Sequence, residues 1–227
     1  MGIRVTVIDS GVNPWHSHVQ GVEGGLSFRL SESGEVEEND DYRDELGHGT
    51  AIAGLIRERA PHAKLQAFKI FHRELYAPAP VLLAALERAI RIGSKIVHLS
   101  LGTEQPGVRE TLAGLCAEAD EQDIVVVAAA RGPEDRVYPA SLDSVIGVYW
   151  DPACEEGSLI VHPGKAVEFG AFGRPRSLPG LPQERNLKGN SFAAARVTAL
   201  AAAYLCKHPS AGSASVRDML KRMERGG

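Results

Sequence analysis

The sequence predicts an α/β fold: a three-layer αβα sandwich built on a mostly parallel sheet. Short apolar runs rich in β-branched residues, such as residues 3–8 and 124–130, are typical of parallel strands buried on both faces. Segments with helical spacing, at 80–92 and 108–122, alternate with such runs. The chain has 227 residues, of which 44% are hydrophobic, and this is enough to bury one large core. We therefore expect a single domain over residues 1–227.

The same two patterns place the other elements in chain order. The expected strands are residues 3–8, 26–30, 64–71, 95–101, 124–130, 160–161 and 166–169, with one more after the Tyr138-Pro139-Ala140 turn. The expected helices are residues 48–56, 80–92, 108–122 and 191–205, with a short amphipathic C-terminal helix capped by Ser215. The segment 191–205 is rich in alanine and almost free of charge, which is typical of a helix buried on all sides.

Composition and charge argue against several classes of function. The formal net charge of −4 gives no signal for nucleic acid or an anionic membrane, and no apolar stretch approaches the length of a membrane span. Cys116, Cys154 and Cys206 show no metal-ligand spacing, so we interpret them as buried small hydrophobic residues. We assign no metal and no cofactor, and calcium binding stays open. An odd number of thiols, with no signal peptide before the first strand, predicts a cytoplasmic protein.

Three polar residues stand at the ends of apolar elements. Ser191 lies at the start of the buried helix, where a backbone N–H and the helix dipole favour negative charge. Asp9 ends the first strand, at the edge where open α/β sheets place their sites, and His48 opens another small-residue helix. A serine alone is more often a helix cap, and an aspartate alone a turn residue. Together, in the order Asp, His, Ser, they form one of the known orders of a catalytic triad.

These residues lie in motifs that resemble those of the subtilisin-like serine proteases. Ile8-Asp9-Ser10-Gly11 is similar to the family's Asp motif, His48-Gly49-Thr50-Ala51-Ile52-Ala53-Gly54 to its His motif, and Gly189-Asn190-Ser191-Phe192-Ala193 to its Ser motif. The resemblance extends over roughly residues 3–205. It implies a subtilisin-like fold and hydrolysis of peptide bonds through an acyl-enzyme. In that chemistry Ser191 attacks the carbonyl, His48 transfers the proton, and Asp9 orients the imidazole.

The resemblance also implies a set of residues that bind the substrate peptide. Ser100, Leu101 and Gly102 match the family's strand end that pairs with the substrate main chain. Ala129 and Ala130 are further substrate-binding residues that the resemblance implies. An ordinary strand end before a turn is the alternative interpretation of the first segment.

The oxyanion hole departs from the family pattern. The family usually places an asparagine after the strand at 124–130, whereas this chain has Gly132 there. In subtilisin, losing that donor costs about 3 to 4 kcal/mol of transition-state stabilisation. We expect the Ser191 N–H and the Asn190 amide to hold the oxyanion, with Arg131 as the second candidate donor.

Residues 31–45 form a strongly acidic stretch that leads directly into His48. The plain interpretation is a solvated loop. The functional hypothesis is that some of its carboxylates lie beside the cleft and favour basic residues on the acyl side of the scissile bond.

The sequence thus predicts a serine endopeptidase that processes one specific peptide or precursor, for example by removing a leader from a modified bacterial peptide. Its partner is then a peptide or protein substrate, and its oligomeric state stays open. Two alternatives use the same residues. One is a catalytically weak or inactive pseudoprotease that binds peptides, which the missing asparagine favours. The other is acyl transfer to an amine instead of water.

Overall fold

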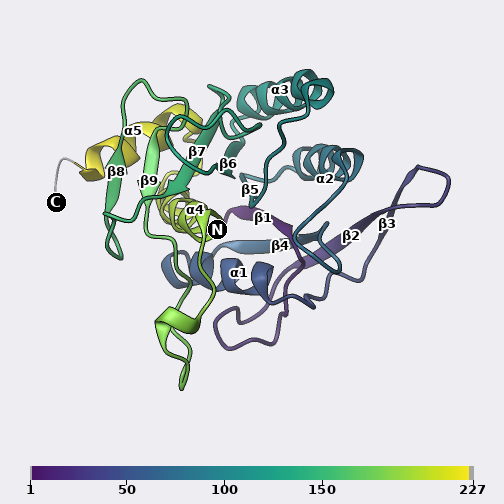
Figure 1. The fold of residues 1–227 in the computed structure, drawn as a ribbon, viewed down its shortest axis with the longest axis horizontal. Coiled ribbons are helices and arrows are strands. Elements are labelled where there is room, and N and C mark those ends of the chain that lie inside the picture. Colours follow the sequence, from purple (N-terminus) through teal and green to yellow (C-terminus); the bar gives the residue numbers. More distant parts are fainter. Residues whose placement is uncertain (1, 225–227) are drawn as a thin grey trace.

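One nine-stranded sheet organises the computed structural model, which describes residues 2–224 (Figure 1). The strand order is β3-β2-β4-β1-β5-β6-β7-β9-β8, and within the described residues only the edge pairs β2–β3 and β8–β9 are antiparallel. The strands are β1 (Arg4–Asp9), β2 (Gly24–Leu30), β3 (Val36–Asn39), β4 (Lys64–Lys69), β5 (Ile96–Leu99), β6 (Val125–Ala129), β7 (Val145–Trp150), β8 (Leu159–Val161) and β9 (Phe169–Ala171). The helices are α1 (His48–Arg59), α2 (Ala79–Arg91), α3 (Pro106–Glu121), α4 (Asn190–Lys207) and α5 (Ser213–Glu224), with a short 3-10 turn, η1 (Gln183–Arg185).

Helices cover both faces of this sheet and so complete three layers. Helices α1, α4 and α5 pack on one face, in a core that includes Ile52, Val197 and Leu220. Helices α2 and α3 pack on the other face, in a second core that includes Leu86 and Leu112. Figure 1 shows α2 and α3 together on one side of the strands. The mostly parallel sheet between two helical layers confirms the fold class predicted from the sequence.

The central strands are apolar throughout because each face meets a different core. In β6, Val125 and Val127 pack in the core that contains α4, whereas Val126 and Ala128 pack in the core that contains α2 and α3. All four side chains are fully buried. Successive side chains of a strand point to opposite faces, so a strand covered on both sides has no solvent-facing positions for polar residues.

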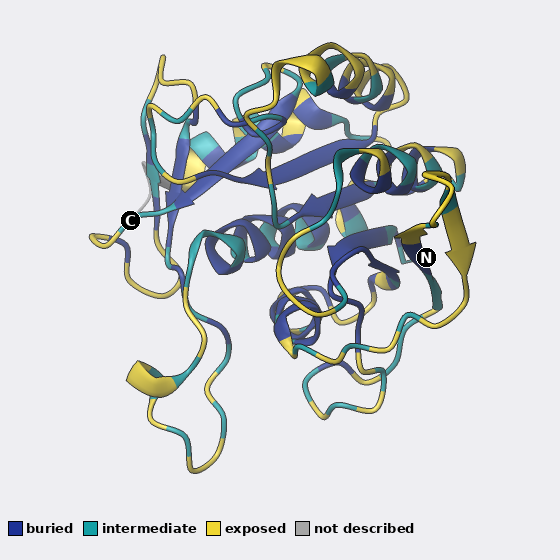
Figure 2. Cartoon of the chain, turned by 45° about the vertical axis from the view of Figure 1, so that its right-hand side comes forward, coloured by how far each residue is buried: buried dark blue, intermediate teal, exposed yellow. Residues whose placement is uncertain are grey.

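The alanine-rich helix α4 runs through the first of these cores. Ala193, Ala194 and Ala195 are all 0% exposed, as the sequence pattern predicts, and Figure 2 shows most of the helix as buried. Small side chains allow α4 to approach α1 and the sheet closely without leaving voids. The helix that carries Ser191 is therefore held firmly from several sides.

Most element ends differ from the sequence prediction by a few residues, and three differences have a clear physical reason. Residues 36–39, expected as loop, form the edge strand β3, whose charged side chains hide it from a hydrophobicity pattern. Helix α5 begins at Ser213, because the Gly212 carbonyl already accepts from the Val216 N–H, so Ser215 is not its cap. The last strand lies at Phe169–Ala171 instead of 166–169, since pairing with β7 begins only at Phe169.

The described residues bear on the membrane, cysteine and metal expectations as well. None of the described helices combines the length and apolarity that a bilayer crossing requires. Cys116 and Cys154 are buried free thiols, and Cys206 is half-buried. Burial raises the pKa of the Cys116 thiol to about 12, which makes it unreactive near neutral pH. Over residues 2–224, no group of three or more His, Cys, Asp or Glu side chains is arranged to hold a metal ion.

Candidate active site

The site residues predicted from the sequence meet at the carboxyl edge of three neighbouring strands. Asp9 is the last residue of β1, Ser100 follows β5, and Ala130 follows β6; these strands are adjacent in the sheet. Parallel strands present their carboxyl ends at one edge, which is where open α/β sheets place their ligands. Helices α1 and α4 bring His48 and Ser191 to the same edge through their first turns.

Asp9 and His48 form a buried hydrogen-bonded pair. The Nδ1 atom of His48 lies 2.8 Å from Oδ1 and 3.0 Å from Oδ2 of Asp9, and the two residues are 7% and 0% exposed. The Ser10 N–H donates to Oδ1 of Asp9 at 2.7 Å. A carboxylate only accepts hydrogen bonds, so Nδ1 of His48 carries the proton and Nε2 is left as the basic nitrogen.

The charges of this pair shift both pKa values. Burial alone disfavours the carboxylate, but the charge of His48 and the hydrogen bonds to Asp9 outweigh it, so the pKa of Asp9 is lowered. Burial likewise disfavours the imidazolium, but the charge of Asp9 outweighs it, so the pKa of His48 is raised above 6.5. The pair therefore has the electrostatics of a carboxylate that supports a histidine base.

The acidic residue Asp44 fixes the start of α1 and hence the position of His48. Its carboxylate accepts from the Gly47 N–H at 2.9 Å, from the Thr50 N–H at 2.9 Å and from the Thr50 hydroxyl at 2.6 Å. Two further donors, the Ser10 hydroxyl and the Leu46 N–H, lie 2.9 Å away. Asp44 thus satisfies N–H groups that the first turn of a helix leaves unpaired.

A glycine next to His48 allows α1 to approach the end of β1. A Cβ atom built on Gly49 would lie 2.1 Å from the Gly11 carbonyl oxygen and 3.1 Å from Oδ1 of Asp9. No side chain fits in that space, so the glycine that follows His48 is a requirement of the close contact between Asp9 and the helix.

Ser191 stands beside this pair at the start of α4. Its hydroxyl donates to the carbonyl of Ser100 at 3.2 Å, and its backbone N–H belongs to the first turn, where helices leave donors free. The ring of the next residue, Phe192, lies 5.1 Å from the ring of His48. The structure therefore places Ser191 at the same sheet edge as Asp9 and His48, through its contact with Ser100 and the packing of Phe192 against His48. The Ser191 hydroxyl has to leave the Ser100 carbonyl before it can donate to Nε2 of His48.

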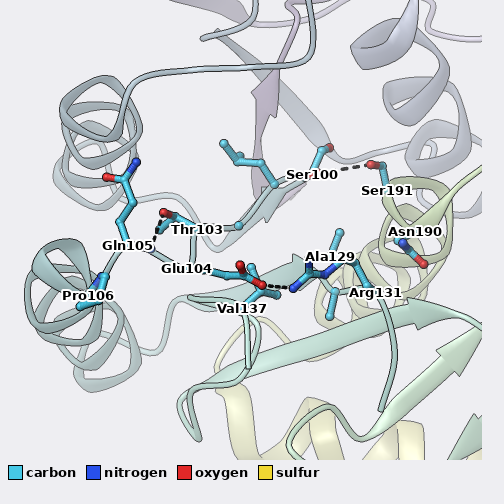
Figure 3. A pocket seen from close by; sticks show the side chains of 13 residues that line it. Ser100, Thr103, Glu104, Gln105, Pro106, Ala129, Arg131, Val137, Asn190 and Ser191 are labelled. Atoms are coloured by element: carbon cyan, nitrogen blue, oxygen red, sulfur yellow. Dashed lines mark hydrogen bonds and ion pairs between the residues drawn. The ribbon is translucent and has the colours of Figure 1, made fainter. Parts of the chain in front are cut away.

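A cavity of about 720 Å³ opens next to Ser191 (Figure 3). Every residue predicted for the cleft walls lines it: Ser100, Leu101, Gly102, Ala129 and Ala130. Thr103, Glu104, Gln105, Pro106, Arg131, Val137, Asn190 and Ser191 complete the lining. The cavity lies between the ends of β5 and β6, and Asn190 and Ser191 from the first turn of α4 belong to its lining.

Asn190 lines the cavity, and one end of its side-chain amide is held in place. Its Oδ1 accepts from the Trp150 N–H at 2.9 Å, which assigns the oxygen end of the amide to β7 and leaves the Nδ2 end as a donor. Gly132 does not line the cavity and has no side chain to offer. A Cβ atom built on Gly132 meets nothing within 4 Å, so its position is sterically open.

Arg131, the second candidate donor, is occupied by two carboxylates. Its guanidinium donates to Asp135 from Nε at 3.1 Å and from Nη2 at 3.0 Å, and it also contacts Glu104 across the cavity. Figure 3 shows the Glu104 and Arg131 side chains reaching toward each other from the two walls. These hydrogen bonds raise the pKa of Arg131 and lower that of Asp135. Arg131 would have to break them to reach an oxyanion beside Ser191.

The acidic stretch at 31–45 is more occupied by internal contacts than its composition suggests. Besides the capping role of Asp44, three ion pairs use its carboxylates: Glu38 with Arg88, Asp41 with Arg43, and Glu45 with Lys69. None of these residues lines the cavity beside Ser191. The prediction that this stretch selects basic substrates stays a prediction.

Sequence reasoning missed two residues at the site. His98 is a fully buried polar residue in the strand Ile96–Leu99, and Glu104 is a cavity wall residue four positions after Ser100. A single polar side chain inside an apolar run was the available signal for His98. For Glu104 no local pattern exists, because its importance comes from Arg131, which lies far away in the sequence.

A parallel α/β sheet with an Asp–His pair and a helix-start serine at one edge has the architecture of the α/β serine peptidases. The chain belongs to the subtilase family, whose model matches residues 1–150. That match includes Asp9 and His48 and ends before Ser191.

Curated relatives extend the similarity over almost the whole chain. Subtilisin of Bacillus pumilus is 30% identical over 236 residues, which cover 96% of this chain and 82% of the relative. Subtilisin E of Bacillus subtilis (strain 168) is also 30% identical over 96% of this chain. The chain spans only 59% of the length of that relative.

Solved structures agree on the fold. A crystal structure of a lanthipeptide protease matches 97% of this chain and 80% of its own with a TM-score of 0.74 and 18% identity. A cold adapted subtilisin-like serine proteinase matches 98% of this chain and 82% of its own with a TM-score of 0.75 and 19% identity. The expected subtilisin-like fold is therefore confirmed.

Proposed function

We propose that this chain is a serine endopeptidase that hydrolyses peptide bonds through an acyl-enzyme. Ser191 attacks the scissile carbonyl while Nε2 of His48 takes its proton, and His48 then returns the proton to the leaving amine. Asp9 holds the imidazole in the Nδ1–H form and stabilises its charged state. A water molecule, activated by the same histidine, releases the acyl group and restores Ser191.

One observation carries this proposal: the buried contact between His48 and both carboxylate oxygens of Asp9, directly beside the serine at the start of α4. Burial of a charged pair is unfavourable unless the geometry and the remaining hydrogen bonds compensate it. Apolar side chains could fill the same space without the cost of burying charge, so the arrangement supports a chemical role. The Ser191 N–H and Nδ2 of Asn190 are the donors that we assign to the oxyanion.

We further propose that the substrate is one peptide or precursor with a basic residue on the acyl side of the cut. The cavity wall carries Arg131 and Glu104, and together with Asp135, which pairs with Arg131, they have a net charge of −1. Asp135 alone can neutralise Arg131 through its two hydrogen bonds. Glu104 is thus the carboxylate that a substrate lysine or arginine can recruit from the cavity.

A peptide-binding pseudoprotease is the second candidate function, and the absence of a side-chain donor at Gly132 is the observation that favours it. Both candidates predict binding of peptides in the cavity, but only the peptidase predicts covalent chemistry at Ser191. Acyl transfer to an amine would use the same acyl-enzyme and differs only in its product.

A cleavage profile on a peptide library, with wild type and Ser191→Ala compared side by side, tests the proposal. We expect defined cleavage products from the wild type and none from the variant, with unchanged circular dichroism of the variant. Added amine nucleophiles would reveal acyl transfer as a new ligated product. Peptide binding by both proteins without any cleavage would contradict the peptidase and favour the pseudoprotease.

A further inference from the structure

His98 is a buried histidine that the proposed mechanism does not use. It is the only polar side chain of β5, it is 0% exposed, and it does not line the cavity. Both of its ring nitrogens have partners: Nδ1 lies 2.9 Å from Oγ1 of Thr198, and Nε2 lies 3.0 Å from Oγ of Ser100. Thr198 is itself 0% exposed and belongs to α4, the helix that carries Ser191.

Ser100 connects this histidine to both ends of the triad. Its hydroxyl acts on the carboxylate of Asp9 and helps to lower the pKa of that group, and its backbone carbonyl accepts from the hydroxyl of Ser191. The orientation of the Ser100 side chain therefore bears directly on how Asp9 is held.

The donors and acceptors along this chain of contacts can be assigned from chemistry alone. The carboxylate of Asp9 only accepts, so the Ser100 hydroxyl donates to it. The oxygen of Ser100 must then accept from Nε2–H of His98. Burial lowers the pKa of His98 to about 4, so the ring is neutral and has a single N–H. Its Nδ1 is therefore the acceptor, and the hydroxyl of Thr198 donates to it.

We propose that His98 is a positioning residue for the triad: as the neutral Nε2–H tautomer it holds the Ser100 hydroxyl on Asp9. This inference rests on the proposed function and names a residue through which the sheet and α4 act on the catalytic carboxylate. Two successive hydrogen bonds, from Thr198 to His98 and from His98 to Ser100, point their positive ends toward the Ser100 hydroxyl, which in turn acts on the carboxylate of Asp9. Such chains polarise one another and strengthen the last bond.

The assignment predicts the direction of a pH effect. Besides His98 itself, the titratable groups that act on it are Asp9 in β1 and His48 in α1. Removing the hydrogen bonds from Thr198 to His98 and from His98 to Ser100 leaves the charge of Asp9 less compensated, so Asp9 attracts the imidazolium of His48 more strongly. The pKa of His48 then rises, and the acid limb of kcat/KM moves to higher pH.

The kinetic test compares the wild type with His98→Leu, His98→Gln and Thr198→Val. We expect His98→Leu to lower kcat roughly tenfold with little change in KM, and to move the acid limb upward. The Gln variant keeps an N–H donor at the Nε2 position and should restore most of kcat and the wild-type limb. Thr198→Val should have a smaller effect in the same direction. Thr6→Val is the matched control and should change neither quantity. Thr6 lies in β1, and its buried hydroxyl is 2.7 Å from the hydroxyl of Ser94.

A second readout does not depend on activity. In protein containing 15N-labelled histidine, we expect the ring of His98 to stay in the neutral Nε2–H form between pH 5 and pH 8, in the wild type and in Ser191→Ala. A protonated ring in that range, or a dominant Nδ1–H tautomer, would overturn the proposal whether or not the chain cleaves peptides.

Failure of the proposed peptidase function and failure of the positioning role of His98 give different results. If no serine-directed fluorophosphonate labels the wild type while the His98 spectrum is as expected, the proposed function fails and the hydrogen-bond chain stands. If the wild type is active but His98→Leu leaves kcat and the acid limb unchanged, the positioning role fails and the peptidase stands. A loss of kcat with an unmoved limb, matched by Thr6→Val, would reduce His98 to a structural residue and so also overturn the proposal.

Discussion

The two halves of the candidate site differ in how deeply their polar groups are buried. In the acid–base half, Asp9 and His48 are buried and hold each other through two contacts. In the oxyanion half, Asn190 and Arg131 lie at an open cavity, and Gly132 offers no side chain. The first half follows the family pattern, whereas the second departs from it. The comparison suggests that the burial of Asp9 and His48 leaves little freedom for change, while the cavity edge tolerates replacement of a donor.

The largest effect should come from the residue that both halves share. Ser191→Ala removes the nucleophile and should lower cleavage about a thousandfold or more, because the rest of the site cannot form an acyl-enzyme. The turnover number on the best library peptide measures this. Ser33→Ala, on the exposed hairpin between β2 and β3, is the control and should be fully active. Equal activity of the Ser191 and Ser33 variants would contradict the triad.

The oxyanion half is tested next, at Asn190. Asn190→Ala should lower kcat by roughly ten- to a thousandfold with a smaller change in KM, because the amide contact strengthens in the transition state. Asn190→Asp separates the two roles of this side chain. It keeps an acceptor for the Trp150 N–H but loses the Nδ2 donor, so we expect wild-type thermal stability with low kcat. A fully active Asp variant would mean that Asn190 serves only to anchor β7.

Gly132→Asn should move the oxyanion half toward the family pattern. A Cβ atom at Gly132 meets no atom within 4 Å, so the first atom of the new side chain displaces no neighbour. We expect kcat to rise, by up to about tenfold, and Asn190→Ala to cost less in this background because a second donor is present. The double-mutant cycle of these two substitutions measures that coupling. Strict additivity of the two effects would count against a shared role at the oxyanion.

Selectivity should change less than turnover when the cavity wall is altered. Glu104→Gln removes the carboxylate that we assign to a basic substrate residue, so the ratio of kcat/KM for lysine over phenylalanine at that position should fall severalfold. The preference should also weaken with added salt, since Glu104 is exposed and screened. Glu110→Gln, which changes the net charge equally on an exposed face of α3, is the control. An unchanged ratio in the Glu104 variant would leave selectivity to other residues.

The smallest expected effect is on stability, whose pH dependence is opposite to that of activity. The pKa of His48 is raised above 6.5 in the folded state, so its pairing stabilises the fold fully below pH 6.5 and less as pH rises through the folded pKa. Activity needs the neutral imidazole and should instead increase across that same range. Urea titrations of wild type and His48→Gln should show a difference in unfolding free energy that shrinks as pH rises. A difference that grows with pH would contradict the raised pKa.

The comparison also explains what could be predicted from the sequence. Apolar runs such as residues 124–130 identify the buried strands. Asp9 and His48 are predictable because a buried acid–base pair requires particular residue types at the ends of particular elements. The edge strand β3 could not be predicted, because pairing with β2 holds it in place and its charged side chains form no hydrophobic pattern. The contact between Glu104 and Arg131 joins two separate loops, so no local pattern contains it. His98 stands out in the sequence as a polar residue inside an apolar run. Its role depends on Ser100 and Thr198, which only the fold brings together.

The central claim, that Asp9 and His48 activate Ser191, is tested most directly by intact-mass spectrometry after reaction with a fluorophosphonate across a range of pH. We predict a single adduct, mapped to Ser191, whose rate of formation follows the titration of one group with a pKa above 6.5 and collapses in His48→Gln. No adduct, an adduct elsewhere in the chain, or a rate that is indifferent to pH and to His48 would contradict the account.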